Sequence, residues 1–214
     1  PKKDVHSSLK AQVDSPAWRL VAALQTLVTP DGNTPAIDGW FEHVRPLTQR
    51  ERALIAESAR TRNEEEVKRQ LGVPRWIDDL PWRESLERLV SQPTVNIEGL
   101  VAGYTGPGGK TVLPARGVAK LDLRLVPNMT VADCLPKLRA HLAGRGFGDV
   151  EVNMTGGYDP NETAEEAGVI RAQQAVFTRA NVPWTLFPRS AGSWPGFVFT
   201  GEPLRKPAGQ FGLG

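Results

Sequence analysis

The residue of this chain best suited to chemistry is His6, in the segment Asp4-Val5-His6-Ser7-Ser8 near the first residue. An imidazole can transfer a proton or donate a hydrogen bond to developing negative charge, but either task needs a second reacting group nearby. The neighbouring residues supply none, and a surface or capping histidine at a strand end is the other interpretation. A catalytic His6 would serve a site completed elsewhere, which predicts that the chain is a piece of a larger enzyme.

Neither a metal site nor a hydrolytic serine is apparent in the rest of the sequence. A catalytic zinc site takes three or more His, Asp or Glu ligands, yet His6, His43 and His141 are far apart and none belongs to a paired motif. His141 lies in a helical pattern and is expected to be solvated. Ser193 lacks the Gly-x-Ser-x-Gly elbow and has no histidine after it. We expect this chain to hold neither a catalytic metal nor a general base.

Arg124 is the cation whose position fits recognition of a carboxylate. Lys120, Asp122 and Arg124 alternate with leucines, which predicts a half-buried strand with a polar face. A guanidinium presents two parallel N–H donors that match a carboxylate in geometry and in charge. A surface ion pair with Asp122 explains the same position, so both interpretations stay open.

Two amphipathic helices are expected to support these residues. Apolar residues at helical spacing predict the first helix over 16–28, where Pro16 takes the first helical position and loses no hydrogen bond. The second is expected over 130–145. Because a proline in a helix interior costs about 3 kcal/mol, we expect this helix to start near Asp133 and to leave Pro136 in its first turn.

Alternation of apolar and polar residues predicts the strands. They are expected over 2–8, at both ends of 94–126 around a Gly- and Pro-rich loop, and over 150–154. Residues 34–93 read as a mixed excursion with two short helices near 48–58 and 63–71, and a further helix is expected over 165–180. The order β, α, excursion, β, β, α, β is that of a ferredoxin-like plait, an α+β fold with an antiparallel sheet and two helices on one face. A partial α/β segment would follow it.

The composition indicates a globular protein and bears on which partners it can have. The 214 residues are 40% hydrophobic, which suits a globular protein, and the net charge is only +2. No apolar run approaches the roughly 20 residues that span a bilayer, and basic residues do not gather with aromatic ones as in nucleic-acid-binding surfaces. We expect neither a membrane nor a nucleic-acid partner. The single Cys134 excludes an internal disulfide and suits a reducing compartment, so we expect a cytoplasmic protein.

Several blocks of sequence resemble one family of metallopeptidases. The opening Asp-x-His-Ser resembles the start of its inserted lid, and further blocks follow in the family's order: Ser15–Val21, Asn96–Gly99, Gly103-Tyr104, Gly106–Ala115, Arg124–Pro127 and Ala191–Pro195. The family is that of the zinc-dependent aminoacylases, glutamate carboxypeptidases, carnosinases and desuccinylases, and the carnosinase-like dipeptidases are the most similar. The resemblance implies a lid and dimerisation domain over 1–157, interrupted by the excursion 34–93, and a returning segment of catalytic domain over 158–214.

The resemblance also implies roles for particular residues. His6 would reach into the partner subunit's active site and donate to the oxyanion of the tetrahedral intermediate. Arg124 would bind the terminal carboxylate of the substrate, and Thr111 would contact substrate, although a structural turn explains Thr111 equally well. Gly192 and Ser193 match a Gly-Gly-Ser turn that lines the substrate pocket, with alanine at 191 in place of the first glycine.

The resemblance implies a homodimer and an amide-bond hydrolase acting on dipeptides, peptides with a free carboxyl end or N-acyl amino acids. Zinc, or cobalt or manganese, would be held by a catalytic domain outside this chain, so the chain alone is expected to be inactive. A second interpretation is a non-catalytic dimerisation module from a degenerate relative. The two differ in whether the flanking sequence of the parent protein retains the metal ligands.

Overall fold

The computed structural model describes residues 1–192 and 194–210, which form two compact units. The first unit is assembled from Pro1–Glu42, Pro93–Arg124 and Ala132–Thr155. The second is assembled from His43–Gln92, Leu125–Val131 and the described residues from Gly156 onward. Most of the expected excursion therefore belongs to the same unit as the residues that follow the plait in sequence.

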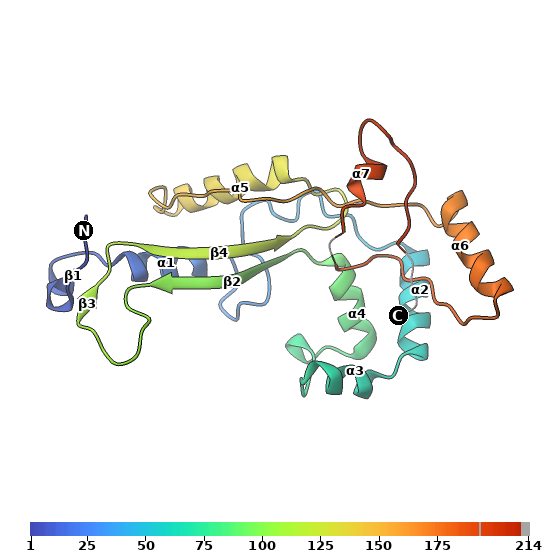
Figure 1. Ribbon diagram of the computed structural model, residues 1–214, viewed down its shortest axis with the longest axis horizontal. Helices are drawn as coiled ribbons and strands as arrows, with labels where there is room; N and C mark the ends of the chain where they lie inside the picture. The colour runs from blue at the N-terminus through green and yellow to red at the C-terminus, as the bar shows by residue number, and fades with distance from the viewer. Residues whose placement is uncertain (193, 211–214) are drawn as a thin grey trace. The chain divides into compact units, whose positions relative to one another are not determined.

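The first unit contains four strands in two antiparallel pairs (Figure 1). They are β1 (Val5–His6), β2 (Thr94–Ala102), β3 (Val112–Leu113) and β4 (Gly117–Arg124). The pair β2–β4 confirms the strands predicted at both ends of 94–126, and its register is shifted between Ile97 and Gly99. The pair β1–β3 joins the first residues of the chain to a loop that the sequence indicated only as Gly- and Pro-rich.

Helix α1 packs against β4 as an amphipathic helix should. The helices of this unit are η1 (Ser7–Ala11), α1 (Pro16–Gln25) and α5 (Val131–Gly144), except that Val131, the first residue of α5, belongs to the second unit. The backbone N–H of Trp18 donates to Ser15 Oγ at 3.4 Å, and Pro16 takes the first helical position as predicted. Close approach of helix and strand depends on Gly117, since a Cβ there would lie 3.1 Å from Leu20 Cδ2.

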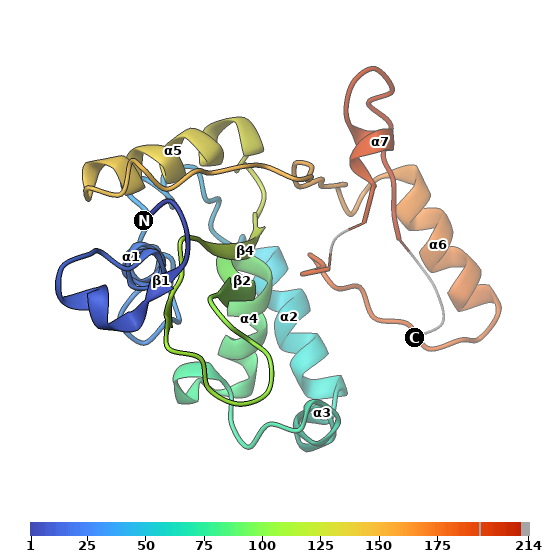
Figure 2. The same cartoon turned by 60° about the vertical axis from the view of Figure 1, so that its left-hand side comes forward.

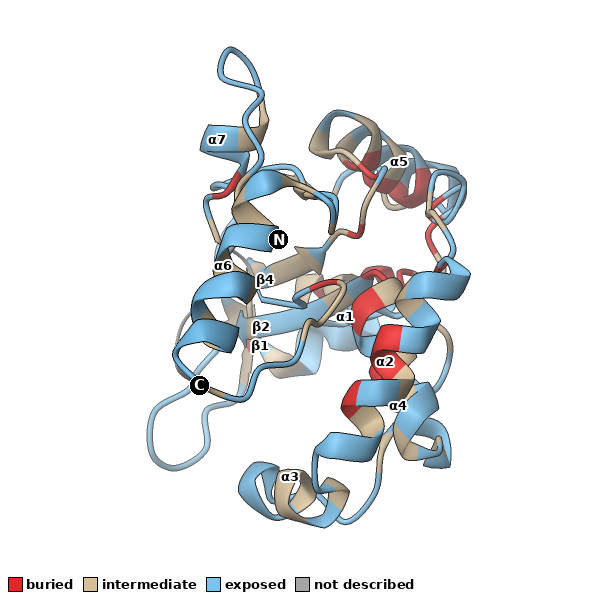
Figure 3. Cartoon of the chain, turned by 90° about the vertical axis from the view of Figure 1, so that its right-hand side faces the viewer, coloured by how far each residue is buried: buried red, intermediate tan, exposed pale blue. Residues whose placement is uncertain are grey.

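The start of α5 differs from the prediction near Asp133. The helix begins at Val131, whose N–H donates to Asp159 Oδ1 at 2.7 Å, and Pro136 lies inside it. The proline removes one intrahelical hydrogen bond, but a cap supplied from distant sequence satisfies a donor in the first turn. Cys134, Leu138 and Leu142 are buried along one side of the helix (Figure 3).

The strand predicted over 150–154 is not formed. These residues have the alternating pattern of a strand, but within the described part of the chain no neighbouring strand pairs with them. The carbonyl of Val152 instead accepts from Arg139 Nη2 at 3.0 Å, and Met154 is 47% exposed. The antiparallel sheet of the predicted plait is accordingly replaced, in the described residues, by two separate two-stranded sheets.

The second unit is mainly helical. Its elements are α2 (Gln49–Thr61), α3 (Glu64–Leu71), η2 (Ile77–Asp79), α4 (Trp82–Ser91), α6 (Gly168–Arg179) and α7 (Phe197–Thr200). Helices α2 and α4 lie side by side (Figure 2) and bury a core of Leu47, Ile55, Leu86 and Val90. Phe187, from a segment without regular structure, packs against that core. Helices α2, α3 and α6 confirm predictions, whereas α4 was not predicted.

The α+β class is confirmed. None of the helices among the described residues is long and apolar enough to cross a membrane.

Candidate functional site

The pairing of β1 with β3 brings two of the predicted site residues together. His6 lies opposite Val112, and the N–H of Ser7 donates to the carbonyl of Thr111 at 3.2 Å. Asp4 closes the other end of the pair, because its Oδ1 accepts from the N–H of Ala115 at 2.8 Å. His6 and Thr111 are therefore neighbours across a short ladder, although 105 positions separate them in the sequence.

The hydrogen bonds of His6 determine which ring nitrogen carries the proton. The N–H of Ser8 donates to Nδ1 at 3.2 Å, and Ser8 Oγ lies 2.8 Å from the same nitrogen. A backbone N–H can only donate, so the neutral ring must carry its proton on Nε2. Within the part of the chain that the structure describes, His6 is exposed and its ring makes hydrogen bonds through Nδ1 alone. The Nε2–H group is thus presented as a donor at the end of β1.

Thr111 ends a loop of exposed residues between β2 and β3. The loop is closed locally: Tyr104 Oη donates to the carbonyl of Pro107 at 2.9 Å, and Lys110 Nζ lies 5.6 Å from the centre of the Tyr104 ring. Gly108 has a φ of +77°, a conformation that glycine adopts without strain. These contacts make the loop a folded turn rather than an extended chain, while the Thr111 side chain stays exposed.

Arg124 lies at the end of β4, opposite Thr94 on β2. Its Nε donates to Asp122 Oδ2 at 2.5 Å, so the ion pair considered from the sequence is present. Both residues share a face of the strand pair with Asn96, which lies opposite Asp122. The Arg124 side chain remains 44% exposed. Glu151 and Asn153, in the segment predicted as a strand over 150–154, lie outside any strand, and Asn153 Nδ2 donates to Glu151 Oε1 at 2.8 Å.

Gly192 belongs to the second unit, in an exposed turn where its N–H donates to Ser190 Oγ at 3.2 Å. Ser193, the other residue predicted for this turn, lies outside the described residues.

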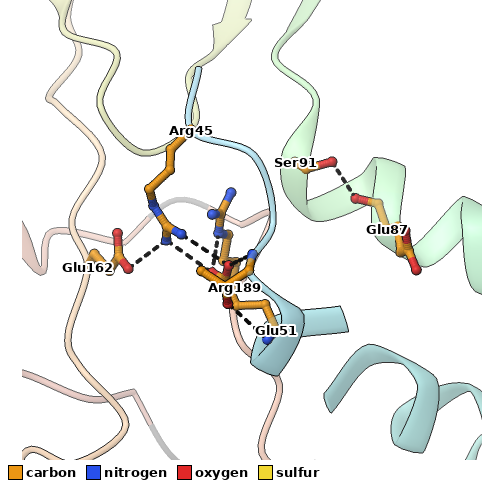
Figure 4. A network of polar contacts seen from close by, with 7 residues as sticks. Arg45, Glu51, Glu87, Ser91, Glu162 and Arg189 are labelled. Atoms are coloured by element: carbon orange, nitrogen blue, oxygen red, sulfur yellow. Dashed lines mark hydrogen bonds and ion pairs between the residues drawn. The ribbon is translucent and has the colours of Figure 1, made fainter. Parts of the chain in front are cut away.

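A network that sequence reasoning missed precedes this turn (Figure 4). Two arginines converge on Glu51: Arg45 donates through both terminal nitrogens at 3.0 and 3.1 Å, and Arg189 donates through Nε at 2.9 Å. Arg45 also contacts Glu162 at 2.7 Å. Only 12% of the Glu51 side chain and 5% of the Arg189 side chain are exposed.

Glu51 also forms a capping box with Thr48 at the start of α2. The N–H of Thr48 donates to Glu51 Oε2 at 2.7 Å, and the N–H of Glu51 donates to Thr48 Oγ1 at 3.1 Å. Burial alone would raise the pKa of Glu51, but the hydrogen bonds from Arg45, Thr48 and Arg189 prevail and lower it to about 2. The Thr-x-x-Glu spacing could have indicated the cap in the sequence. No local pattern indicates Arg189, which lies 138 positions away.

The prediction that His141 is solvated is wrong. Its side chain is fully buried, with Nε2 2.9 Å from the carbonyl of Thr26 and Nδ1 accepting from the N–H of Asp38 at 3.1 Å. Because each ring nitrogen has a backbone partner, this histidine joins the end of α1 to α5 and has no nitrogen available to bind a metal. Among the residues that the structure describes, no group of three or more His, Cys, Asp or Glu side chains could hold a metal ion.

The family model for the peptidase dimerisation domain of M20 peptidases matches residues 1–149. The chain belongs to this family. The match includes β1 with His6, the loop with Thr111, and Arg124, and it confirms the family suggested by the sequence blocks.

The relatives of this M20 domain are peptidases by their names, and two of those described here are named as metallo-enzymes. The Cys-Gly metallodipeptidase of Schizosaccharomyces pombe is 34% identical over 60% of this chain and 26% of its own length. The rat Beta-Ala-His dipeptidase is 29% identical over 74% of the chain and 32% of its own length. Among solved structures, a metallo-carboxypeptidase of the M20 family from Sulfolobus solfataricus has a TM-score of 0.83 at 32% identity, covering 96% of this chain and 46% of that one. Human carnosine dipeptidase 1 has a TM-score of 0.81 at 26% identity, with coverages of 97% and 44%.

The chain thus spans about a third or less of these curated relatives and under half of the solved chains. Two of these relatives are named as metallo-enzymes, whereas the described residues of this chain do not gather ligands for a metal ion.

Proposed function

We propose that this chain is the lid and dimerisation part of a two-metal amide-bond hydrolase acting on dipeptides or N-acyl amino acids. Membership of the M20 family supports the assignment, as do two relatives whose names describe dipeptide hydrolysis. We assign residues 1–157 to the lid and 158–214 to a returning part of the catalytic domain. Zinc, cobalt or manganese would be held outside the described residues and would supply the activated water. A reducing compartment such as the cytoplasm suits the single buried Cys134.

The observation that carries the proposal is the hydrogen-bond state of His6. An oxyanion donor must be a fixed N–H at the position where negative charge develops, and Nε2–H is such a group because Ser8 holds Nδ1 as an acceptor. His6 is the last residue of β1 and is exposed. We propose that it acts in the active site of the partner subunit of a homodimer.

We further propose that the exposed residues beside His6 and along β4 bind the substrate. Thr111 would contact the substrate from the closed loop. Arg124 would bind its terminal carboxylate, with Asp122 fixing the guanidinium through Nε. Gly192 and Ser193 would line the pocket from the turn in the second unit.

Subunit mixing in the intact enzyme tests this function. A His6→Ala subunit is combined with a subunit made inactive by changing one of its own metal ligands. If His6 crosses the interface, each heterodimer regains one working site, because the intact metal site receives the intact histidine of its partner.

Recovery of about half the activity per heterodimer is the expected result, with subunit exchange verified by mass spectrometry. No recovery would show that His6 acts within its own subunit or not at all. If the unchanged enzyme hydrolyses no dipeptide or N-acyl amino acid when loaded with metal, the non-catalytic dimerisation module is the better description.

A further inference from the structure

Two side chains, those of Phe187 and Arg189, hold the residues just before the Gly192 turn against the helical part of the second unit. Residues 184–190 form no helix or strand and contain only a bend at Pro188, yet Phe187 packs against the core of α2 and α4 and Arg189 is buried. Ser190, Ala191 and Gly192 are all exposed. Arg189 is therefore the last anchored residue before the turn, and its position determines where the turn begins.

Glu51 is the acceptor that holds Arg189. It receives Nε of Arg189 at 2.9 Å while the capping box and Arg45 fix the carboxylate from other directions (Figure 4). A carboxylate constrained by a helix start and by a second arginine has little freedom to move. The first turn of α2 is thus a rigid support for the segment that carries Arg189.

Among residues 1–192 and 194–210, Glu51 is the one acceptor of Arg189. The two terminal nitrogens of Arg189 are buried and have no hydrogen-bond partner within those residues. A buried cation whose partner is removed is strongly destabilised, because neither water nor another acceptor compensates its charge. Loss of the Glu51 charge should therefore drive the guanidinium out to solvent and take Ser190 and the following turn with it.

We propose that Glu51 and Arg189 form a positioning pair that fixes the 190–192 turn for substrate binding, with Glu51 acting through Arg189. The inference rests on the proposed function, because it takes Gly192 as part of the substrate site. It also gives the helical excursion a role, because Glu51 at the start of α2 holds Arg189 in place. No local sequence pattern indicates this contact.

Trypsin digestion of the 214-residue chain tests the pair independently of any activity. Trypsin must take the arginine side chain into its specificity pocket, so the Arg189–Ser190 bond is protected while Arg189 is buried. Glu51→Gln should raise the initial cleavage rate at this bond at least tenfold, measured by mass spectrometry of the first fragments. The matched control is Glu165→Gln, which breaks the more exposed pair with Arg50 and should change that rate less than twofold.

Kinetics of the intact enzyme test the consequence for substrate. Glu51→Gln should raise KM at least fivefold and change kcat less than twofold, since a displaced turn weakens binding without touching the reacting atoms. Arg45 keeps Glu162 as a partner in this variant. Glu51→Gln with Arg189→Met should return KM to within threefold of the unchanged enzyme, because methionine fills buried space without a charge.

Three results would overturn the inference: unchanged cleavage at Arg189–Ser190, an unchanged KM, or a double variant as impaired as Glu51→Gln alone. Failure of the proposed function is a different outcome. It would show as an unchanged enzyme without hydrolase activity, while the cleavage experiment would still report whether Glu51 holds Arg189.

Discussion

His6 and His141 use their ring nitrogens in different ways, and the difference separates a chemical role from a structural one. Among the described residues, exposed His6 makes hydrogen bonds through Nδ1 only, whereas His141 is buried and both of its ring nitrogens bond to the backbone. A donor toward substrate needs a nitrogen that the fold has not already used. By that criterion His6 can act in catalysis, whereas His141 stabilises the fold.

Substitution of Arg124 is expected to change KM by an amount that depends on whether the substrate has a free carboxylate. Arg124→Lys in the intact enzyme keeps the positive charge but loses the two-pronged geometry. KM should rise about tenfold for substrates with a free carboxylate and less than twofold for the corresponding amides, with kcat little changed. Steady-state kinetics on matched acid and amide substrates measure this, with Lys120→Arg as the control on the same strand. Equal rises in KM for acid and amide would contradict carboxylate recognition.

At the scale of elements, several hydrogen bonds between residues far apart in the sequence are made at the ends of helices. The start of α2 is fixed by Thr48 and Glu51, the end of α1 is fixed through His141, and the start of α5 is fixed by Asp159. The first and last turns of a helix leave backbone groups unsatisfied, so side chains from distant segments can bond there and join elements. Two of these ends give stability predictions.

His141→Phe should destabilise the fold by about 2–4 kcal/mol, because the carbonyl of Thr26 and the N–H of Asp38 both lose a partner. Phenylalanine keeps most of the buried volume, so the loss reports mainly the hydrogen bonds. Urea unfolding measures the change. Ala140→Gln on the exposed side of α5 is the control and should stay within about 0.5 kcal/mol. If His141→Phe lowered the free energy of unfolding by less than about 0.5 kcal/mol, water or a neighbouring group would have to replace the hydrogen bonds of the imidazole.

Glu51 makes stability depend on pH in acid. Its pKa falls from an ordinary 4.5 to about 2 in the folded chain. A lowered pKa contributes stability that is complete above the unfolded value and is lost as the pH falls through the folded one. About 3 kcal/mol should therefore disappear between pH 5 and pH 2.

Urea unfolding at intervals across that range measures the effect in the unchanged chain and in Glu51→Gln. Several other carboxyl groups also have lowered pKa values, among them Asp38 beside Arg145 and Glu165 beside Arg50, so the difference between the two profiles isolates Glu51. Parallel profiles would show that Glu51 titrates normally.

At the scale of the whole molecule, we propose that two copies of the chain associate through β2, since the matching family is that of a peptidase dimerisation domain. Among the described residues β2 pairs only with β4, and Ile97, Leu100 and Val101 on it are 50%, 47% and 58% exposed. An edge strand with exposed apolar residues is suited to pairing with another copy of itself across a two-fold axis.

Leu100→Lys should raise the dissociation constant of the dimer at least tenfold, because a charge on an edge strand opposes pairing. Light scattering over a range of concentrations measures it. Leu89→Lys on α4 replaces a residue that is 53% exposed and should leave association unchanged. A chain that remains monomeric at high micromolar concentration, or equal effects of both lysines, would contradict an interface on β2.

Local sequence determined those features whose causes lie within a few residues. Ser15 and Pro16 start α1 because a hydroxyl and an N-terminal proline satisfy the needs of a first turn wherever it lies. The alternation around Arg124 determined β4, since one face of that strand meets α1. The order of the sequence blocks was sufficient to identify the family.

Only the tertiary structure decided which polar groups are buried and which groups form hydrogen bonds with them. Residues 150–154 have a strand pattern but no strand beside them, and the pairing of β1 with β3 joins His6 to a loop more than a hundred positions away. His141 and Arg189 have no local feature that marks them as buried, because a polar side chain can leave water only where distant groups supply its hydrogen bonds. Those partners, Thr26 and Asp38 for the one and Glu51 for the other, come into reach only when the chain folds.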